Sequence, residues 1–264
     1  MEYSKIKQVA KEAGFEAGKE LYQRFLKFDR GTVKFKSGHE IVTQADLASE
    51  KIILKKIKSN FPDHRILSEE SGDTKKNSDY LWVVDPLDGT TNFSMHNPLW
   101  SISIAVLYKR KVFLGLVYAP FLDELFLAEM GKGSKLYSPA KNTRGKKLKV
   151  SGVRENRVLN TFCHGTSEKD IQKTLDYYRK QKLNDLDCRQ LGSAAIELAF
   201  VAAGRVESIV IPGAHAWDVA AGVLLVRESG GKVTDASGKP WSLNSQDMVA
   251  TNGRVHKQVL EVLK

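Results

Sequence analysis

The chain has 264 residues, of which 42% are hydrophobic, and its 41 Lys and Arg against 31 Asp and Glu give a net charge of +10. This length suits one large domain or two modest ones, and no apolar run approaches the roughly 18 residues that cross a membrane. No apolar secretory core follows the first charged residues, and two cysteines fit a reducing compartment. We therefore expect a cytoplasmic protein with no membrane partner.

The first half of the chain mixes helices and strands. Helical spacing of apolar residues predicts two helices, at 3–28 and 45–59. The stretch 29–42 between them contains glycines and charged residues, which indicates a hairpin or a mobile loop. Short apolar runs predict strands at 65–67, 81–84, 100–107, 112–118 and 125–129. This order predicts an α+β half.

The second half alternates strand and helix more regularly. Residues 131–152 are rich in loops, and we place the boundary there, with halves at 1–140 and 141–264 that form one catalytic unit. The predicted elements after the boundary are strands at 158–162 and 206–211 and helices at 168–181, 193–203 and 217–228. This alternation predicts an α/β half.

Residues 82–93 read WVVDPLDGTTNF and carry the most specific signal of the chain. A buried strand ends at Asp85, which Pro86 biases toward an extended backbone. Asp88 follows, and then a Gly-Thr-Thr turn with free backbone N–H groups. Carboxylates suit Mg²⁺ and N–H groups suit a phosphate, so the pattern indicates chemistry on a phosphate held by metal ions. Taken alone, D-P-x-D-G is more typical of a turn.

The segment DPLDGTTNF at 85–93 closely resembles the signature of the inositol monophosphatase family, whose members are metal-dependent, lithium-sensitive sugar-phosphate phosphatases. Further matches lie in the family's order: LSEES at 67–71, AWDVAAG at 216–222 and, more weakly, VTQAD at 42–46. Several ordered motifs make chance similarity improbable. The resemblance implies a layered α-β-α-β-α sandwich with the metal site between the two halves, and a homodimer.

The resemblance also implies a ligand set for two or three Mg²⁺ ions. Asp85 bridges two ions, Glu69 and the Leu87 carbonyl complete the first site, and Asp88 and Asp218 complete the second. Converging carboxylates repel by about 4 kcal/mol per pair at 4 Å and an effective dielectric of 20, a cost that bound dications remove. Two metals ~3.5–4 Å apart also stabilise the attacking and leaving oxygens.

The catalytic residues that the resemblance implies are Asp46, Glu69 and Thr90. Thr90 orients a metal-activated water, together with Asp46 or Glu69. Asp46 has a second interpretation, because Thr43 begins a pattern typical of a capping box at the start of the second helix. That role needs no catalysis, and the two roles are compatible.

The phosphate would lie on the N–H groups of Gly89, Thr90 and Thr91, at the start of the helix that follows. Lys36 matches a basic residue that the family brings near the metals. Its alternative is an ordinary solvated lysine, one of many in this basic chain.

The segment RQLGSAA at 189–195 resembles the family segment that contacts the organic part of the substrate, through Ser193. Ser193 equally fits the N-cap of a helix. One position departs from the pattern: inositol-specific members carry a glutamate seven residues before the aspartate of the W-D motif, and here Ile211 stands there. An apolar side chain cannot accept hydrogen bonds from ring hydroxyls, so strict specificity for myo-inositol 1-phosphate is not expected.

We therefore expect Mg²⁺-dependent hydrolysis of a small sugar or polyol phosphomonoester, with fructose-1,6-bisphosphatase activity as an option. The enzymatic alternatives are a 3′(2′),5′-bisphosphate nucleotidase and a histidinol-phosphate phosphatase. A non-enzymatic alternative is an RNA- or protein-binding regulator, because the chain is basic and the run 141–149 holds five Lys and Arg. A solvated loop or hairpin is the favoured interpretation of that run, since no aromatic residues interleave its charges.

Overall fold

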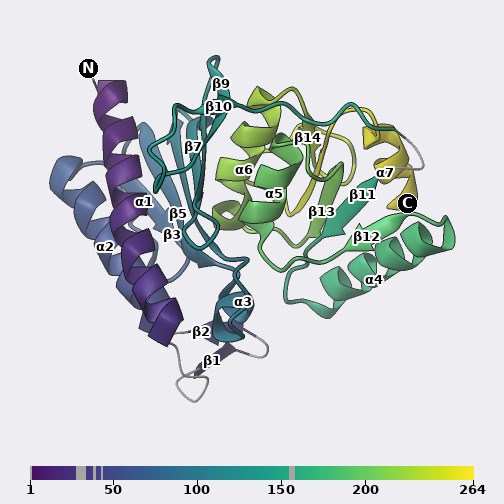
Figure 1. The fold of residues 1–264 in the computed structure, drawn as a ribbon, viewed down its shortest axis with the longest axis horizontal. Coiled ribbons are helices and arrows are strands. Elements are labelled where there is room, and N and C mark those ends of the chain that lie inside the picture. Colours follow the sequence, from purple (N-terminus) through teal and green to yellow (C-terminus); the bar gives the residue numbers. More distant parts are fainter. Residues whose placement is uncertain (1, 28–33, 38–39, 43, 155–157) are drawn as a thin grey trace.

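The computed structural model describes residues 2–27, 34–37, 40–42, 44–154 and 158–264, without the side chains of 34–42. Five layers follow one another across the molecule (Figure 1). Helices α1 (Glu2–Lys27) and α2 (Gln44–Asn60) form the outer layer of the first half. The order helix, sheet, helix, sheet, helix confirms the predicted sandwich.

The first sheet has eight strands. They are β3 (Arg65–Ser68), β4 (Gly72–Asp73), β5 (Tyr80–Asp88), β6 (Ser101–Tyr108), β7 (Lys111–Ala119), β8 (Glu124–Glu129), β9 (Gly133–Tyr137) and β10 (Lys146–Lys147). Their order across the sheet is β10-β9-β8-β7-β6-β5-β3-β4. Among the pairs of this sheet in the described residues, only β3–β5 is parallel. The chain between these two strands contains β4, which pairs antiparallel with β3 on its other side. The meander β6–β7–β8 matches the prediction.

The second sheet has five strands in the order β12-β11-β13-β15-β14. They are β11 (Leu159–Phe162), β12 (Asp187–Arg189), β13 (Ser208–Pro212), β14 (Lys232–Thr234) and β15 (Asp247–Thr251). Helices α5 (Ala194–Ala202) and α6 (Ala216–Glu228) lie between the two sheets, and α4 (Glu168–Leu183) and α7 (His256–Val262) cover the far face (Figure 1). The central helix layer thus has a sheet on each side.

Helix α6 is apolar nearly all round, and this agrees with its place in the middle layer. Its residues from Val219 to Val226 are all buried. The helix lies very close to β7, because a Cβ added at Gly115 would come within 2.6 Å of the Ala221 carbonyl oxygen. A glycine on the strand therefore allows the backbone of α6 to approach the first sheet. This contact fixes the start of α6 relative to β5 and β6.

Several boundaries differ from the prediction. The stretch at 131–152, predicted to be rich in loops, also contains β9 and β10, which extend the meander and were not predicted as strands. The predicted strand at 81–84 runs further, through Asp88. Within the stretch at 29–42, β1 (Lys34–Ser37) pairs antiparallel with β2 (Glu40–Val42), which agrees with the hairpin alternative. The predicted division at residue 140 stays a prediction, and β10 of the first sheet lies beyond it.

Some elements were not predicted at all. Strands β12, β14 and β15 and helix α7 are short, and periodicity over so few residues is weak. In the parts of the chain that the structure describes, no helix combines the length and the apolar character needed to cross a bilayer.

Candidate active site

The alternation of β5 decides where Asp85 lies. Trp82 and Val84 pack against α1 and α2, whereas Val83 packs against α5 and α6 in the middle layer. Successive side chains of a strand point to opposite faces, so Asp85 follows Val83 onto the middle-layer face. The pairing of β5 with β6 then shifts register between Asp85 and Asp88, which is a bulge. A bulge re-aims side chains at the end of a strand.

Four other carboxylates lie around Asp85, which is only 2% exposed. Burial raises the pKa of Asp85 well above its usual value, and repulsion from Glu69, Asp88, Asp218 and Asp46 raises it further. Each of these groups must lie close enough to Asp85 to act on it through a buried, weakly screened path. The structure therefore brings the carboxylates of the predicted ligands and catalytic residues near one another: Asp46, Glu69, Asp85, Asp88 and Asp218.

Asp88 is held by the start of α5. The hydroxyl of Ser193 donates a hydrogen bond to the Oδ2 atom of Asp88, as does the N–H of Ala195 at 2.9 Å. The N–H of Ala194 reaches Oδ1 at 3.2 Å, and the Ser101 hydroxyl reaches Oδ2 at 3.4 Å. Burial raises the pKa of Asp88 to about 6, although these four hydrogen bonds oppose the rise. The carboxylate thus joins the two halves of the chain.

Asp218 lies in the first turn of α6 and is half-buried. Its Oδ2 atom accepts a hydrogen bond from the N–H of His215 at 3.1 Å, which satisfies a donor at the start of the helix. The hydroxyl of Ser103 on β6 donates to the Trp217 carbonyl at 3.2 Å. The helix start, and Asp218 with it, is therefore tied to the first sheet.

Glu69 follows β3 directly and is half-buried, as is Glu70. The N–H of Glu69 donates to the Val84 carbonyl at 3.1 Å, one residue before Asp85. The buried Glu50 of α2 accepts hydrogen bonds from the N–H and the hydroxyl of Ser71, both at 3.0 Å. This pair of bonds holds the turn that carries Glu69 beside the end of β5.

Asp46 lies in the first turn of α2 and is 1% exposed. One turn later, the hydroxyl of Ser49 donates to the Pro86 carbonyl at 2.7 Å, which fixes the start of α2 against the Asp-Pro segment. Thr43, the first residue of the alternative capping box, lies outside the described residues. That alternative therefore stays a prediction.

The turn after Asp88 brings the backbone of Gly89 close to another segment of the chain. Gly89 has φ 88°, a left-handed conformation that favours glycine. A Cβ at this position would lie 2.9 Å from the Leu99 carbonyl oxygen. The short helix α3 (Thr90–Ser94) begins at once, and the Thr90 hydroxyl donates to the Leu87 carbonyl at 3.1 Å. Leu87 is buried, Thr90 is half-buried and Thr91 is exposed.

The three predicted substrate residues have different outcomes. Ser193 is the N-cap of α5, since its hydroxyl oxygen accepts from the Ile196 N–H, which confirms that interpretation. Ile211 lies on β13 with 2% exposure, inside the core of the middle layer, so its side chain offers no surface at the carboxylates. The Lys36 side chain lies outside the described part of the structure. Substrate contacts by all three stay predictions.

Two residues near the site were missed. The Asn92 amide donates to the carbonyls of Leu99 at 2.7 Å and Leu191 at 2.8 Å, so it ties α3 to the segment before α5. Its place inside the signature at 85–93 was the available signal. Glu197 on α5 accepts from the N–H groups of Leu191 at 3.2 Å and Gly192 at 3.0 Å. The only feature of the sequence that could have pointed to Glu197 was the presence of a glutamate in an otherwise apolar helix.

The donor set fits a hard divalent cation. It consists of carboxylate oxygens and a backbone carbonyl, and Asp85 at its centre is buried. The carboxylates are not arranged as a closed coordination shell, because no three His, Cys, Asp or Glu side chains in the described ranges meet that geometry. Asp88 and Asp218 are instead turned toward protein donors.

The chain is similar to known proteins over most of its length. The sequence profile of the inositol monophosphatase family matches residues 2–264. The chain is 39% identical over 259 residues to the Nus factor SuhB of Pasteurella multocida, which is 97% of this chain and 94% of that protein. It is 37% identical over 224 residues to the fructose-1,6-bisphosphatase/inositol-1-monophosphatase of Thermotoga maritima, which is 85% of this chain and 82% of that protein.

A solved structure gives the same result for the fold. The extragenic suppressor protein suhB from Bartonella henselae superimposes with a TM-score of 0.89 at 31% identity, over 98% of each chain. The profile match, the relatives and the layered fold all extend over nearly the whole chain, which confirms the resemblance found in the motifs. The chain belongs to the inositol monophosphatase family.

Proposed function

We propose that the protein hydrolyses a small sugar or polyol phosphomonoester in a reaction that requires Mg²⁺. The observation that carries this proposal is the burial of Asp85 among four other carboxylates. Such a cluster is unfavourable by itself and becomes favourable with dications bound. Metal dependence and phosphatase activity are general in the family, and the fructose-1,6-bisphosphatase/inositol-1-monophosphatase of Thermotoga maritima supports this substrate class.

In this proposal, Glu69, Asp85, the Leu87 carbonyl, Asp88 and Asp218 would hold two or three Mg²⁺ ions. When bound, Mg²⁺ supplies electrostatic stabilisation of the charge on the phosphate. Because Asp88 and Asp218 come from opposite sides of the site, the ions would also join the two halves. A homodimer is part of the proposal only by family resemblance.

The phosphate would be bound by backbone N–H groups of the turn formed by Gly89, Thr90 and Thr91. The first N–H groups of a helix lack intrahelical acceptors and favour an anion. The Thr90 hydroxyl donates a hydrogen bond to the Leu87 carbonyl, so its Oγ1 lone pairs are available to accept a hydrogen bond from a water. Thr90 and the Asp46 carboxylate would orient that water, with Glu69 as the alternative partner.

The test is phosphate release from a panel of substrates, with Mg²⁺ and with a chelator. The panel contains inositol 1-phosphate, fructose 1,6-bisphosphate, histidinol phosphate, adenosine 3′,5′-bisphosphate and a generic phosphomonoester. We expect Mg²⁺-dependent release from a sugar or polyol phosphate, abolished in Asp85→Asn and unchanged in the exposed control Lys169→Gln. Preference for adenosine 3′,5′-bisphosphate or histidinol phosphate would select one of the enzymatic alternatives. No release from any substrate by the folded protein would contradict the proposal.

A second candidate function rests on the relatives named Nus factor SuhB. The run 141–149 is largely exposed and carries five Lys and Arg, which would suit a binding role toward RNA or an acidic protein. This role predicts salt-sensitive binding that survives Asp85→Asn, because the run lies away from the carboxylates in the sequence and on different strands. A double Lys146→Gln and Lys147→Gln variant should weaken that binding while phosphate release is unchanged.

A further inference from the structure

A cavity of about 420 Å³ lies away from the carboxylates. Tyr80 begins β5 and lines the cavity, whereas Asp85 lies five residues further along the same strand, roughly 17 Å away. The volume falls within the range typical of small-molecule sites. The lining groups that matter are Tyr3, Tyr80, Tyr108, Phe113, Lys109 and Lys111. None of these residues belongs to the candidate active site.

The aromatic walls of the cavity are held in place. Phe113 packs against Tyr3 with ring centroids 5.4 Å apart, and Tyr80 packs against Tyr108 at 4.9 Å. Behind Tyr80, the His64 ring is stacked at 4.5 Å with an interplanar angle of 16°. Rings supported in this way form a preformed apolar surface that another flat ring can contact without ordering side chains first.

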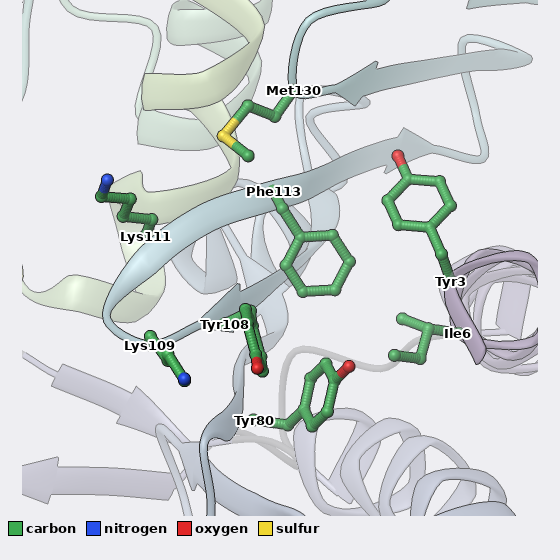
Figure 2. Close-up of a pocket in the computed structure, with 8 residues that line it drawn as sticks. All are labelled: Tyr3, Ile6, Tyr80, Tyr108, Lys109, Lys111, Phe113 and Met130. Carbon is green, nitrogen blue, oxygen red and sulfur yellow. The ribbon is translucent and has the colours of Figure 1, made fainter.

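The two charged residues of the lining are both lysines. Figure 2 shows Lys109 and Lys111 on the side of the cavity away from Tyr3 and Ile6. Lys109 is 3.8 Å from Asp79 and lies over a neighbouring ring. No carboxylate in the described residues forms an ion pair with Lys111, which is exposed.

Acidic groups near the cavity are already engaged. The Tyr80 hydroxyl donates to Glu2 at 3.0 Å, and Glu129 forms ion pairs with Lys7 at 2.8 Å and Lys132 at 3.3 Å. Lys132 also lies over the Tyr3 ring. Glu2 keeps its negative charge, because a tyrosine hydroxyl does not neutralise it, but it is not among the lining residues. The lining itself carries two lysines and no carboxylate, and Lys111 forms no ion pair within the described residues, so the lysine side of the cavity favours a negatively charged group on the ligand.

The lysines sit on a turn whose sequence is unusual for its backbone. Tyr108 pairs with Lys111, so Lys109 and Arg110 form a two-residue hairpin turn, with φ 46° and 66°. Both central residues of such a turn need positive φ, and Asn-Gly is the favoured pair. A lysine and an arginine are more strained there. The chain thus presents cations beside the aromatic wall at a cost in local stability.

We propose that this cavity binds a small planar aromatic anion. The ring of the ligand would lie against Tyr80, Tyr108 and Phe113, and its acidic group would lie at Lys111, with Lys109 beside it. The proposal is independent of the phosphatase activity proposed above, because it concerns a different end of β5.

Isothermal titration calorimetry of the Mg²⁺-loaded protein with three probes of one shape tests the proposal. The probes are 2-naphthoate, its neutral amide and 2-naphthylmethylammonium. We expect 2-naphthoate to bind more tightly than the amide, and the amide more tightly than the ammonium. Equal binding of all three, or no binding of the carboxylate by the folded protein, would overturn the proposal.

Variants locate the binding. Lys111→Gln should weaken the binding of 2-naphthoate by about two- to fivefold, as expected for an exposed charge pair, and leave the binding of the amide unchanged. Tyr108→Ala should weaken both by about three- to tenfold through loss of a ring contact. Lys169→Gln, on an exposed position of α4, is the matched control. If Lys169→Gln weakened 2-naphthoate binding while Lys111→Gln and Tyr108→Ala did not, the assignment of the ligand to this cavity would be overturned.

A turn variant separates binding from folding. Replacing Lys109→Asn and Arg110→Gly together supplies the favoured turn, so we expect a higher melting temperature together with weaker 2-naphthoate binding. Unchanged binding in this variant and in Lys111→Gln would overturn the role of the cations. A dimer that Tyr108→Ala converts to monomers would show instead that a second copy of the chain covers the cavity.

Discussion

At Asp85 the chain buries a carboxylate beside Asp46, Glu69, Asp88 and Asp218, which repel it. The position itself follows from the sequence, because the alternation of β5 and the Pro after Asp85 direct it. The repulsion cannot be derived from the sequence, because it depends on residues up to 133 positions apart in the chain, from Asp85 to Asp218. Its physical consequence is a site that is destabilising until a cation binds.

Asp85→Asn should therefore make the protein more stable in a chelator and inactive with Mg²⁺. Asparagine keeps the Oδ1 acceptor for the Leu87 N–H, at 3.0 Å, and removes the buried charge. We expect a gain of about 1–2 kcal/mol, or about 2–4 °C per kcal/mol in melting temperature. Thermal unfolding with EDTA and with Mg²⁺ measures both effects. A less stable variant in EDTA would argue against the repulsion.

Glu197 is a buried acid outside the predicted ligand set. Its Oε1 atom accepts from the Cys163 thiol at 3.1 Å and from two backbone N–H groups, whereas Oε2 has no partner among the described residues. The nearby Thr161 hydroxyl donates to the Ser208 carbonyl instead. Burial raises the pKa of Glu197 from 4.5 to about 7, so the folded protein keeps this carboxyl protonated where the unfolded chain does not.

The raised pKa of Glu197 gives a signed prediction for stability. A carboxyl whose pKa is raised on folding contributes stability that is fully present below pH 4.5 and is lost as the pH rises to about 7. The loss amounts to roughly 3 kcal/mol. Glu197→Gln should remove this loss, so the difference in unfolding free energy between variant and wild type should grow in favour of the variant across that window. Urea unfolding at several pH values measures it, and a constant difference would contradict the prediction.

At the scale of elements, the contact between α6 and β7 places Asp218 in the site. Gly115 has space for no side chain, because its Cβ would meet the Ala221 backbone. Apolar periodicity predicted α6 and its burial correctly, since a helix that is apolar all round must be covered on all sides. The close approach was not predictable from the strand sequence, because glycine in a strand has several explanations.

Gly115→Ala should destabilise the protein by about 1–3 kcal/mol, because the clash is with backbone that cannot rotate away. Gly152→Ala is the matched control, since a Cβ there meets nothing within 4 Å. It should be neutral or stabilising by about 0.4–1 kcal/mol. Chemical denaturation of the wild type and the two variants, with calorimetry as a second probe, measures these differences in unfolding free energy. Equal effects of the two substitutions would show that the Gly115 contact is not restrictive.

At the scale of the molecule, the proposed ligands come from both halves: β5 supplies Asp85 and Asp88, and α6 supplies Asp218. Mg²⁺ should therefore protect both halves together from local opening. Binding that is saturated at 100 times Kd adds about 2.7 kcal/mol of stability. Hydrogen exchange with Mg²⁺ and with EDTA should show slower exchange at the end of β5 and the start of α6, with β14 as an unaffected control. Protection confined to one half would contradict a shared site.

The sequence by itself determined the long periodic elements, the layered fold class and the family, because these depend on local patterns and on motifs that stand in a fixed order. It also indicated Asp85, Asp88 and Asp218 as candidate ligands. Only the tertiary structure decided which groups meet: the start of α5 on Asp88, the burial of Ile211 in the core and the hidden acid Glu197. Contacts between distant segments depend on how whole layers pack, and no local pattern of residues encodes that packing.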